Sequence, residues 1–460
     1  MNRLPSEVLA SCATFVSDTD PRQIVSLTHV CRYWRKSISS DPRSWASIST
    51  GWRRLVPLCL ERAGAVPLAV DIAVSDIGDG GGFLEPLLPH TSRIDHLCLT
   101  GYTSIEAMAN DLPGFFDSAM PNLTSLELQQ ATEPTNLFPP IEASVPPVFQ
   151  NVAKLESLCL TRTPLYSTLF SIASLKELKL IGYKNLFNFG TFIGLLRSNI
   201  DLERVVLDIQ FVADSVRIPR GRITVPLSRL QHLSITCSRP IDSKGLLSYI
   251  SLPHGAHVEV TSTLSDQSAR LDSFLPSPPM PIRELLAPIT TVKSQLDPRE
   301  LHLFGNGSVF TFRTTQSASN GPSEWTLFPT TAVREFHTDA RPLYLDAFLS
   351  RVMGRLPALE VLAISRAEFP VGLLSALTEE PVLCPALKTI AFFDCNIDSN
   401  TIKQLGKAIA KRRDSTAARL HRVVIVSSTG TPLGVASIRQ LRESIPCVEV
   451  RVDDKLPDLL

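Results

Sequence analysis

The sequence lacks an excess of charge of either sign, because 45 Lys and Arg residues balance 45 Asp and Glu residues for a formal net charge of zero. Such a chain has no overall field that would draw it to nucleic acid or to an anionic membrane surface. No apolar run reaches the length of a membrane-spanning helix, and no signal peptide is expected before Leu4. We therefore expect neither nucleic acid nor a membrane as a partner.

Closely spaced cysteine pairs are also missing. The nine cysteines are scattered, and none forms a C-x-x-C motif: Cys12, Cys31, Cys59, Cys98, Cys159, Cys237, Cys384, Cys395 and Cys447. An odd number of isolated cysteines is typical of reduced thiols, and it argues against a disulfide framework or a structural zinc site. This usage predicts a cytoplasmic or nuclear protein without a bound metal.

The common catalytic signatures are lacking as well: G-x-S-x-G, H-E-x-x-H, the Walker loop and G-x-G-x-x-G. His254 and His257 form an H-x-x-H pair without a third ligand at metal-binding spacing, so a loop pair is favoured over a metal site. The segment Ser427–Gly434 follows an apolar strand pattern but has no lysine, which favours a turn over a phosphate site. We expect no catalytic residue, no cofactor and no enzymatic activity.

What the chain does have is a folded composition, with 44% hydrophobic and 20% charged residues. Its length of 460 residues exceeds one ordinary core, and it indicates either two or three domains or one elongated array.

The first 50 residues read as a small helical hook. Between Leu4 and Ser49, four short motifs follow one another: L-P-x-E-V-L at Leu4–Leu9, P-x-x-I at Pro21–Ile24, V-C-R-x-W at Val30–Trp34, and a closing Ser-Trp. Apolar residues recur at three- and four-residue spacing, as in amphipathic helices. A segment this short has too little core to be stable alone, so it needs a partner or a neighbouring domain.

These motifs, in this order and spacing, resemble the F-box. The resemblance implies docking on the Skp adaptor of a Skp-cullin-F-box (SCF) ubiquitin ligase, and through Skp on a cullin. The chain departs from the family at Cys12 and Ala13, where a bulky pair is usual. The residues expected to contact the adaptor are Leu4, Pro5, Val8, Leu9, Ile24, Leu27, Val30, Cys31 and Trp34. Several of them must also serve the core of the hook, and a helical cap on a repeat array is the alternative reading.

After residue 90 a phrase of the form apolar-x-x-apolar-x-apolar recurs. Its first residues are Ile94, Leu123, Leu155, Leu175, Leu202, Leu230, Leu359, Leu387, Leu420 and Ile445. Within the first six phrases and within the last four, the spacing runs from 20 residues (Leu155 to Leu175) to 33 residues (Leu387 to Leu420), so the phrase carries more weight than the period. It is similar to a leucine-rich repeat, in which the first residue plugs a turn and the next two face inward from a strand.

Helical patterns separate the phrases, at Thr191–Arg197, Ser243–Ile250, Leu345–Met353, Ser399–Lys411 and Val435–Glu443. Strands that alternate with helices favour a parallel sheet with helices on one face. The predicted fold class is α/β: a small helical F-box followed by a curved leucine-rich-repeat-like solenoid, with strands inside and helices outside. The whole chain resembles fungal F-box proteins with degenerate leucine-rich tails.

Two Pro-rich interruptions are expected as extended loops, at Glu133–Pro147 and Ser262–Pro298. After the second, Leu301–Phe304 and Ser308–Thr314 read as a hairpin with Glu324–Phe328 as a third strand, an antiparallel insertion that would split the solenoid. The predicted domains are an F-box (1–50), a helical linker with a first strand (51–89), a front repeat region (90–261), a Pro-rich and hairpin insertion (262–330) and a rear repeat region (331–460).

The strongest basic cluster falls on one expected helix, with Lys403, Lys407, Lys411, Arg412 and Arg413 on one face. A solvated face is the favoured interpretation, and binding of an acidic substrate or adaptor is the alternative.

Together these patterns predict a non-catalytic substrate-recognition subunit of an SCF ubiquitin ligase. It would bind the Skp adaptor through its F-box and an unknown protein substrate through the repeats. A repeat scaffold for protein interaction, without a ligase role, is the alternative. The sequence assigns no substrate-binding residue.

Overall fold

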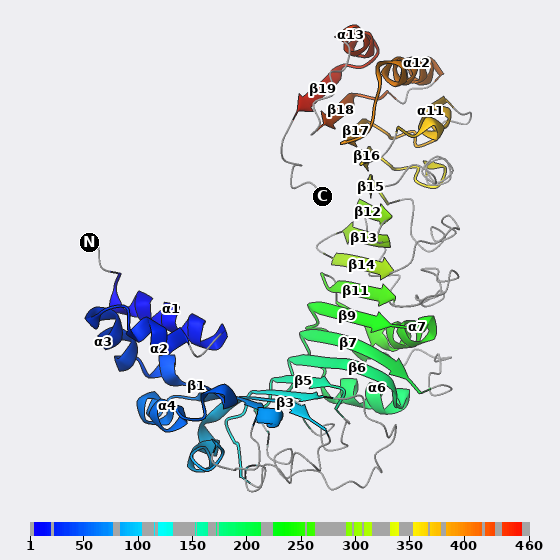
Figure 1. Ribbon diagram of the computed structural model, residues 1–460. Coiled ribbons are helices and arrows are strands. Elements are labelled where there is room, and N and C mark those ends of the chain that lie inside the picture. The colour runs from blue at the N-terminus through cyan, green and yellow to red at the C-terminus, as the bar shows by residue number, and fades with distance from the viewer. Residues whose placement is uncertain are drawn as a thin grey trace. The chain divides into compact units, whose positions relative to one another are not determined.

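The computed structural model of the chain forms two compact units, Met1–Val216 and Arg217–Leu460 (Figure 1). The boundary falls inside the predicted front repeat region. The structure describes residues 4–19, 23–76, 83–103, 115, 118–131, 152, 154–163, 172, 174–212, 224–253, 255–262, 291–296, 299–305, 308–314, 332–339, 353–366, 369–378, 383–415, 419–427 and 435–452.

The first unit opens with a helical hook made of α1 (Ser6–Thr19), α2 (Gln23–Thr28), α3 (Arg32–Ser40) and the 3₁₀ turn η1 (Pro42–Trp45). Pro5 stands just before α1, where a residue with fixed φ and no N–H suits a helix start. α3 ends at Ser40, because the next residue, Asp41, precedes Pro42 and is therefore held in the extended region, with φ −94° and ψ 110°. The mixed α/β fold with an N-terminal helical region is therefore present as predicted.

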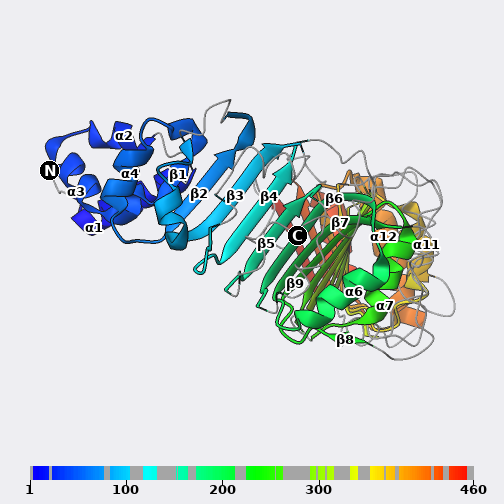
Figure 2. The same ribbon diagram turned by 90° about the horizontal axis from the view of Figure 1, so that it is seen from below.

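A parallel sheet follows the hook. Its strands are β1 (Ser47–Ser49), β2 (Leu68–Ala73), β3 (Ile94–Tyr102), β4 (Ser125–Gln130), β5 (Ser157–Thr161), β6 (Glu177–Phe187) and β7 (Arg204–Phe211), paired in that order (Figure 2). Between them lie η2 (Thr50–Trp52), α4 (Val56–Ala63), η3 (Val74–Asp76), η5 (Leu88–Arg93) and α6 (Phe189–Ser198). α4 ends at Gly64 in a left-handed conformation (φ 56°), which glycine adopts without steric cost.

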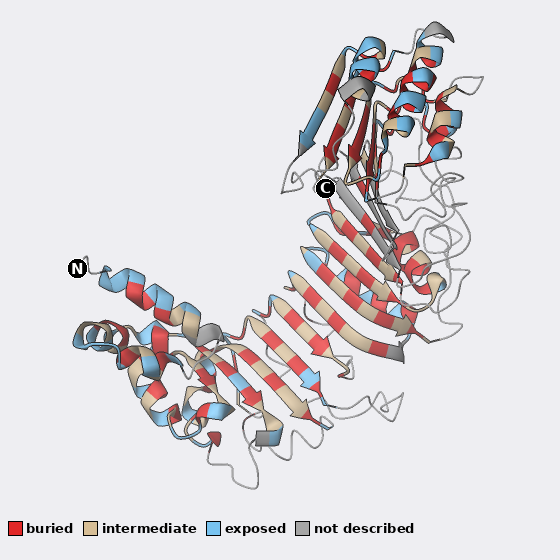
Figure 3. Cartoon of the chain, turned by 45° about the horizontal axis from the view of Figure 1, so that its top comes forward, coloured by how far each residue is buried: buried red, intermediate tan, exposed pale blue. Residues whose placement is uncertain are grey.

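The strands of this sheet are in a register that stacks their leucines in two buried rows. One row is Val70, Leu97, Leu126, Leu158, Leu178 and Val205, and the next is Ile72, Leu99, Leu128, Leu160, Leu180 and Leu207. Every member of both rows is at most 1% exposed. Buried and partly exposed positions alternate along each strand, as Figure 3 shows. The apolar phrase therefore faces inward as predicted, because its spacing puts these side chains on one side of the pleat.

The turns after these strands use several polar groups in place of the asparagine of a regular repeat. The buried Thr163 donates from Oγ1 to the Leu128 carbonyl at 3.2 Å. In the second unit the Cys395 thiol donates in a similar way to the Ile364 carbonyl at 3.3 Å. Arg162, directly after β5, has a left-handed conformation (φ 57°), and so does Gly182 (φ 75°), which lies within β6 where its register against β7 is irregular. A side chain at position 182 would place its Cβ 3.0 Å from Arg162 Cγ, so Gly182 also gives room to its neighbour.

The second unit contains one continuous sheet in the spatial order β9, β11, β14, β13, β12, β15, β16, β17, β18, β19. These strands are β9 (His232–Cys237), β11 (His257–Ser262), β12 (Thr291–Leu296), β13 (Arg299–Gly305), β14 (Ser308–Thr314), β15 (Glu335–Asp339), β16 (Val361–Ser365), β17 (Thr389–Phe393), β18 (Arg422–Ser427) and β19 (Cys447–Val452). β8 (Val225–Pro226) and β10 (Ile250–Ser251) form a separate parallel pair.

The described residues of this unit include four helices: α7 (Pro240–Tyr249), α11 (Val371–Thr378), α12 (Ser399–Ser415) and α13 (Val435–Ser444). α11, α12 and α13 lie side by side along one face of the last strands (Figure 1). Val450, the last inward position of the final phrase, is still 36% exposed, because within the described residues β19 pairs with β18 alone.

The antiparallel insertion is present, but it differs from the prediction in two ways. It does not split the sheet: among the strands that the structure describes here, only β13 is reversed, while β14 pairs parallel with β11, and β12 pairs parallel with β15. The third strand is β12, inside the segment expected to be a loop, and its sequence TVKSQL does not contain the apolar phrase. The segment Glu324–Phe328 lies outside the described residues, as do most of Leu345–Met353 and all of Glu133–Pro147.

β11 and β15 occupy repeat positions although their sequences do not match the apolar phrase. Gly255, two residues before β11, stands where the phrase requires an apolar residue, and the buried Thr338 stands at the second inward position of β15. The prediction that all five basic residues of α12 share one solvated face is wrong for Arg412. Lys403, Lys407, Lys411 and Arg413 are exposed, but Arg412 is only 1% exposed and belongs to the core.

No helix among the described residues is long and apolar enough to span a membrane.

Candidate protein-docking site

Helix α1 presents two different faces. Leu9, Ala10 and Ala13 are buried against the rest of the hook, since α1 contacts α2, α3 and η1. The other face is apolar but open: the side chains of Leu4 (just before the helix), Val8 and Phe15 are 51%, 43% and 71% exposed, and Cys12 is also exposed. Residues spaced by three and four positions share one side of a helix, so these four form one stripe. We call Leu4, Val8, Cys12 and Phe15 the α1 stripe.

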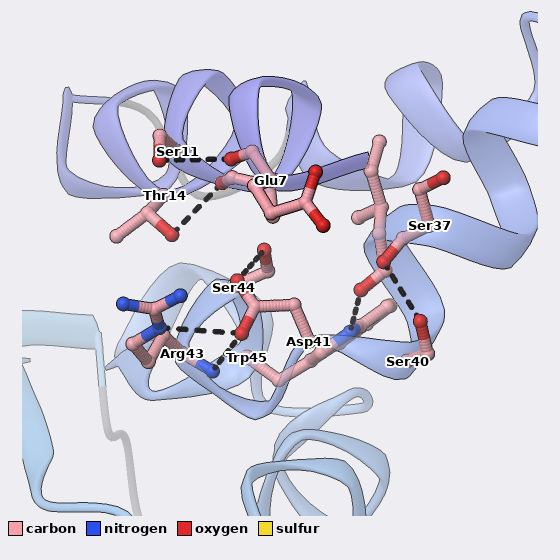
Figure 4. Close-up of polar contacts among 11 residues, drawn as sticks. Glu7, Ser11, Thr14, Ser37, Ser40, Asp41, Arg43, Ser44 and Trp45 are labelled. Atoms are coloured by element: carbon pink, nitrogen blue, oxygen red, sulfur yellow. Dashed lines mark hydrogen bonds and ion pairs between the residues drawn. The ribbon is translucent and has the colours of Figure 1, made fainter. Parts of the chain in front are cut away.

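A shallow groove of about 560 Å³ runs along this stripe. It is lined by Glu7, Val8, Ser11, Cys12, Phe15 and Val16. Its walls come from α1 itself, and Ser11 turns its hydroxyl back to the Glu7 carbonyl at 2.9 Å (Figure 4). The groove is therefore largely apolar, with the carboxylate of Glu7 at its edge. A surface of this chemistry suits docking of another apolar surface more than it suits catalysis.

A second exposed apolar group lies at the turn between α2 and α3. Val30 is 59% exposed and Cys31 is exposed. Tyr33, in the first turn of α3, donates its hydroxyl to the Leu4 carbonyl at 2.8 Å, which fixes the start of α1 against the start of α3. Val30 and Cys31 therefore belong to the same end of the hook as Leu4 and Pro5.

The hook is held on its inner side by Trp45. Its indole Nε1 donates to the Ile38 carbonyl at 3.1 Å, and the Arg62 guanidinium lies 4.3 Å from the ring centroid. Asp41 caps η1 by accepting from the Arg43 backbone N–H and the Ser44 hydroxyl, both at 3.4 Å (Figure 4). A buried, hydrogen-bonded tryptophan in this place connects α3 and α4, so it supports the docking face without contributing to it.

The structure separates the roles of the nine predicted adaptor contacts. Leu9 and Ile24 are buried in the hook, at 2% and 0% exposure, and Leu27 and Trp34 are half-buried. The remaining five are open to a partner: Leu4, Pro5, Val8, Val30 and Cys31. The apolar spacing alone could not divide the set, because core and docking residues of a two-faced helix share the same residue types.

Phe15 and Cys12 belong to the exposed α1 stripe, but the sequence motifs did not place them among the expected adaptor contacts. Phe15 is the most exposed of the large apolar side chains recorded as exposed. A signal was available, because Phe15 follows Val8 by seven residues, the spacing that keeps two side chains on one face of a helix. Ala13 is one of the two positions where the chain departs from the usual F-box pattern. It is fully buried, so its small side chain reduces the apolar volume in the core of the hook and does not alter the exposed face of α1.

The thiols of the first unit differ sharply in their surroundings. Burial raises the pKa of Cys59 to about 11, although the nearby charge of Arg62 acts in the opposite direction. All nine cysteines are free, and Cys12 and Cys31 are the exposed ones. A buried thiol with a raised pKa reacts slowly, so the exposed pair offers a chemical probe of the docking face.

Comparison with known proteins agrees with this location. The family described as F-box-like matches residues 1–51, so the chain carries an F-box-like domain at its N-terminus. No curated protein matches the chain. Among solved structures, the leucine-rich repeat-containing protein LegL7 from Legionella pneumophila is similar at 11% identity, with a TM-score of 0.20, over 77% of this chain and 82% of that one.

Proposed function

We propose that this protein is a non-catalytic substrate-recognition subunit of an SCF ubiquitin ligase. Its F-box-like domain would bind the Skp adaptor, and through it a cullin, while the repeat-like sheets would hold a protein substrate. Holding the substrate next to a ubiquitin carrier raises their effective concentration, which accelerates transfer without any catalytic residue in this chain.

The observation that carries this proposal is the α1 stripe on an F-box-like domain. Leu4, Val8 and Phe15 leave a large apolar area in water, which a folded domain seldom does without a partner. Exposed aliphatic and aromatic side chains gathered in one place are also the usual source of binding energy in an interface.

Binding of the purified full-length protein to a purified Skp adaptor tests the proposal directly. We expect the two proteins to elute together on size-exclusion chromatography as one complex that contains both chains. Addition of a cullin should shift this complex to a larger species. An adaptor that elutes separately from this protein at micromolar concentrations of both would contradict the adaptor role.

The substrate arm of the proposal uses the open face of the first sheet, the face opposite the buried leucine rows. On β4 and β5 this face carries Ser125, Glu127, Ser157, Cys159 and Thr161. Short polar side chains on a broad sheet suit a protein surface better than a small molecule, because they offer hydrogen bonds without a deep pocket.

A second function, a repeat scaffold without a ligase role, is favoured by one separate observation. β1 pairs in parallel with β2, with Ser47 opposite Ala69 and Ser49 opposite Asp71, so the end of the F-box-like domain forms part of the sheet. A terminal cap of a repeat array is joined in this way. The adaptor experiment separates the two, since a cap would show no affinity for Skp.

We place the protein in the cytoplasm or nucleus, where free thiols persist. Nine unpaired cysteines, several of them buried, support this location.

A further inference from the structure

A charged hollow lies in the second unit, far along the chain from the docking site. It occupies about 340 Å³ where the last turns of α12 and α13 meet the start of β18. Arg413, Arg419 and Arg442 line it together with His421. Its base is formed by buried apolar residues, including Leu420 and Ile445.

Basic residues predominate over acidic ones among those that line this hollow. Glu443 is the single acidic residue among those that line it, against three guanidinium groups. In the described part of the chain, the side chains of Arg419 and Arg442 make no hydrogen bond or ion pair. Neighbouring cations behave differently: Arg422 pairs with Glu449 at 2.7 Å, and Lys388 pairs with Glu360 at 2.7 Å.

Helix dipoles explain part of this arrangement. Arg413 and Arg442 lie in the last turns of α12 and α13, where a positive charge stabilises a helix end. The dipole explains neither Arg419, which belongs to no described helix, nor why all three arginines line the same hollow.

We propose that this hollow is a binding site for a phosphate-type oxyanion, either free or carried by a peptide. A guanidinium group is planar and presents several N–H donors in a fixed fork, which matches the oxygens of a phosphoryl group. Arg419 and Arg442 can offer two such groups to one dianion. The apolar base would contact whatever carries the phosphoryl group. This site is independent of the adaptor role, so either can fail while the other stands.

Arginine labelling of the intact protein tests the site without any variant. The protein is treated with an arginine-selective dicarbonyl reagent, with and without inorganic phosphate, and chloride keeps the ionic strength constant. Mass spectrometry then gives the rate at each arginine. We expect phosphate to slow modification of Arg419 and Arg442 at least threefold and to leave Arg439 unchanged. Arg439 is a matched control, since it is exposed on the same helix and does not line the hollow.

A degenerate phosphoserine peptide library, compared with its unphosphorylated form, identifies the source of the oxyanion. If a peptide carries it, the full-length protein should enrich phosphopeptides at least tenfold. The double variant Arg419→Gln with Arg442→Gln should lose this enrichment, while Arg355→Gln with Arg439→Gln, which removes the same charge elsewhere, should keep it. Phosphate protection without phosphopeptide enrichment would assign the site to free phosphate. Absence of protection, or equal slowing at Arg439, would overturn the proposal.

Discussion

Arg412 and Cys384 are joined by a buried hydrogen bond between a side chain and the backbone. Nη2 of Arg412 lies 2.6 Å from the Cys384 carbonyl oxygen, and Nη1 lies 2.9 Å from the Leu383 carbonyl. The Cys384 thiol donates in turn to the Met353 carbonyl at 3.0 Å. Burial lowers the pKa of Arg412 and raises that of Cys384 to about 12. One arginine thus fastens the end of α12 to the loop before β17.

Replacement of Arg412 should therefore destabilise the second unit. In Arg412→Ala the buried Cys384 carbonyl and the part-buried Leu383 carbonyl lose their donors, and a buried unsatisfied group costs about 1 to 3 kcal/mol. We expect the free energy of unfolding to fall by about 2 to 4 kcal/mol, measured by urea denaturation. Lys411→Ala is the matched control, because Lys411 is exposed on the same helix and should change stability by less than about 0.5 kcal/mol. Equal effects of the two variants would mean that the buried bonds contribute nothing.

Charge on the α1 stripe should abolish adaptor binding without unfolding the hook. In Val8→Asp with Phe15→Asp, both side chains stay in water in the free protein but would be buried in the complex. We expect at least a hundredfold weaker binding, since interface anchors contribute about 2 kcal/mol or more each. Isothermal titration calorimetry measures the affinity, and circular dichroism checks the fold.

Leu9→Ala is the contrasting variant. Leu9 is 2% exposed, so its truncation should cost about 2 to 5 kcal/mol of stability and weaken adaptor binding only through loss of folded hook. If the stripe variant and Leu9→Ala lose binding and melt to the same extent, the division into open and core residues is wrong.

Thiol labelling should outline the adaptor interface. Cys12 and Cys31 are exposed, while Cys59 is buried with its pKa raised to about 11. Iodoacetamide should therefore alkylate Cys12 and Cys31 first, followed by mass spectrometry of the peptides. An added Skp adaptor should slow labelling at these two positions and leave Cys447 unchanged. Protection at Cys447 alone would place the partner elsewhere.

An acidic residue in a leucine row should disrupt the first unit. Leu158 is fully buried between Leu126 and Leu178, so Leu158→Asp would bury a carboxylate without a partner. We expect a loss of more than about 3 kcal/mol, or no folded unit, by thermal and urea unfolding. Glu156→Gln, two positions earlier and exposed in an ion pair with Lys176, should be nearly neutral.

Glu177, on the open face of the first sheet, should make a pH-dependent contribution to the stability of the folded protein. Partial burial acts to raise its pKa, but hydrogen bonds from Lys179 and Ser157 and the charge of Arg204 outweigh it, so the pKa falls below its ordinary 4.5. A carboxyl group with a lowered folded-state pKa stabilises the protein above its unfolded pKa and loses that effect as the pH falls through the folded value.

Glu177→Gln should accordingly be slightly less stable than the wild type at pH 7, by less than about 1 kcal/mol because the group is partly in water. The difference should shrink as the pH falls below 4.5 and vanish once the wild-type carboxyl is protonated. Urea denaturation across this range measures it. A difference that grows in acid would have the wrong sign for an ion-paired carboxylate.

Local patterns in the sequence predict much of this fold. The apolar phrase places its inward residues correctly from Leu97 to Val448, because a strand repeats every two residues and a half-buried sheet demands alternation. The pattern misses β11 and β15, where a single phrase position is not apolar, at Gly255 and Thr338. These strands still form because pairing with their neighbours tolerates one non-apolar residue. It also fails at β12, whose partners β13 and β15 come later in the chain.

The sequence by itself determined the α/β class, the F-box-like hook and the inward face of most strands, because these depend on the spacing of apolar residues within a few turns or strands. Only the tertiary structure decided which side of α1 is open, so that Leu9 serves the core while Val8 and Phe15 face water. It alone buried Arg412 among exposed lysines and brought Arg419 and Arg442 to one hollow. These outcomes depend on which elements pack together, and spacing along the chain does not contain that information.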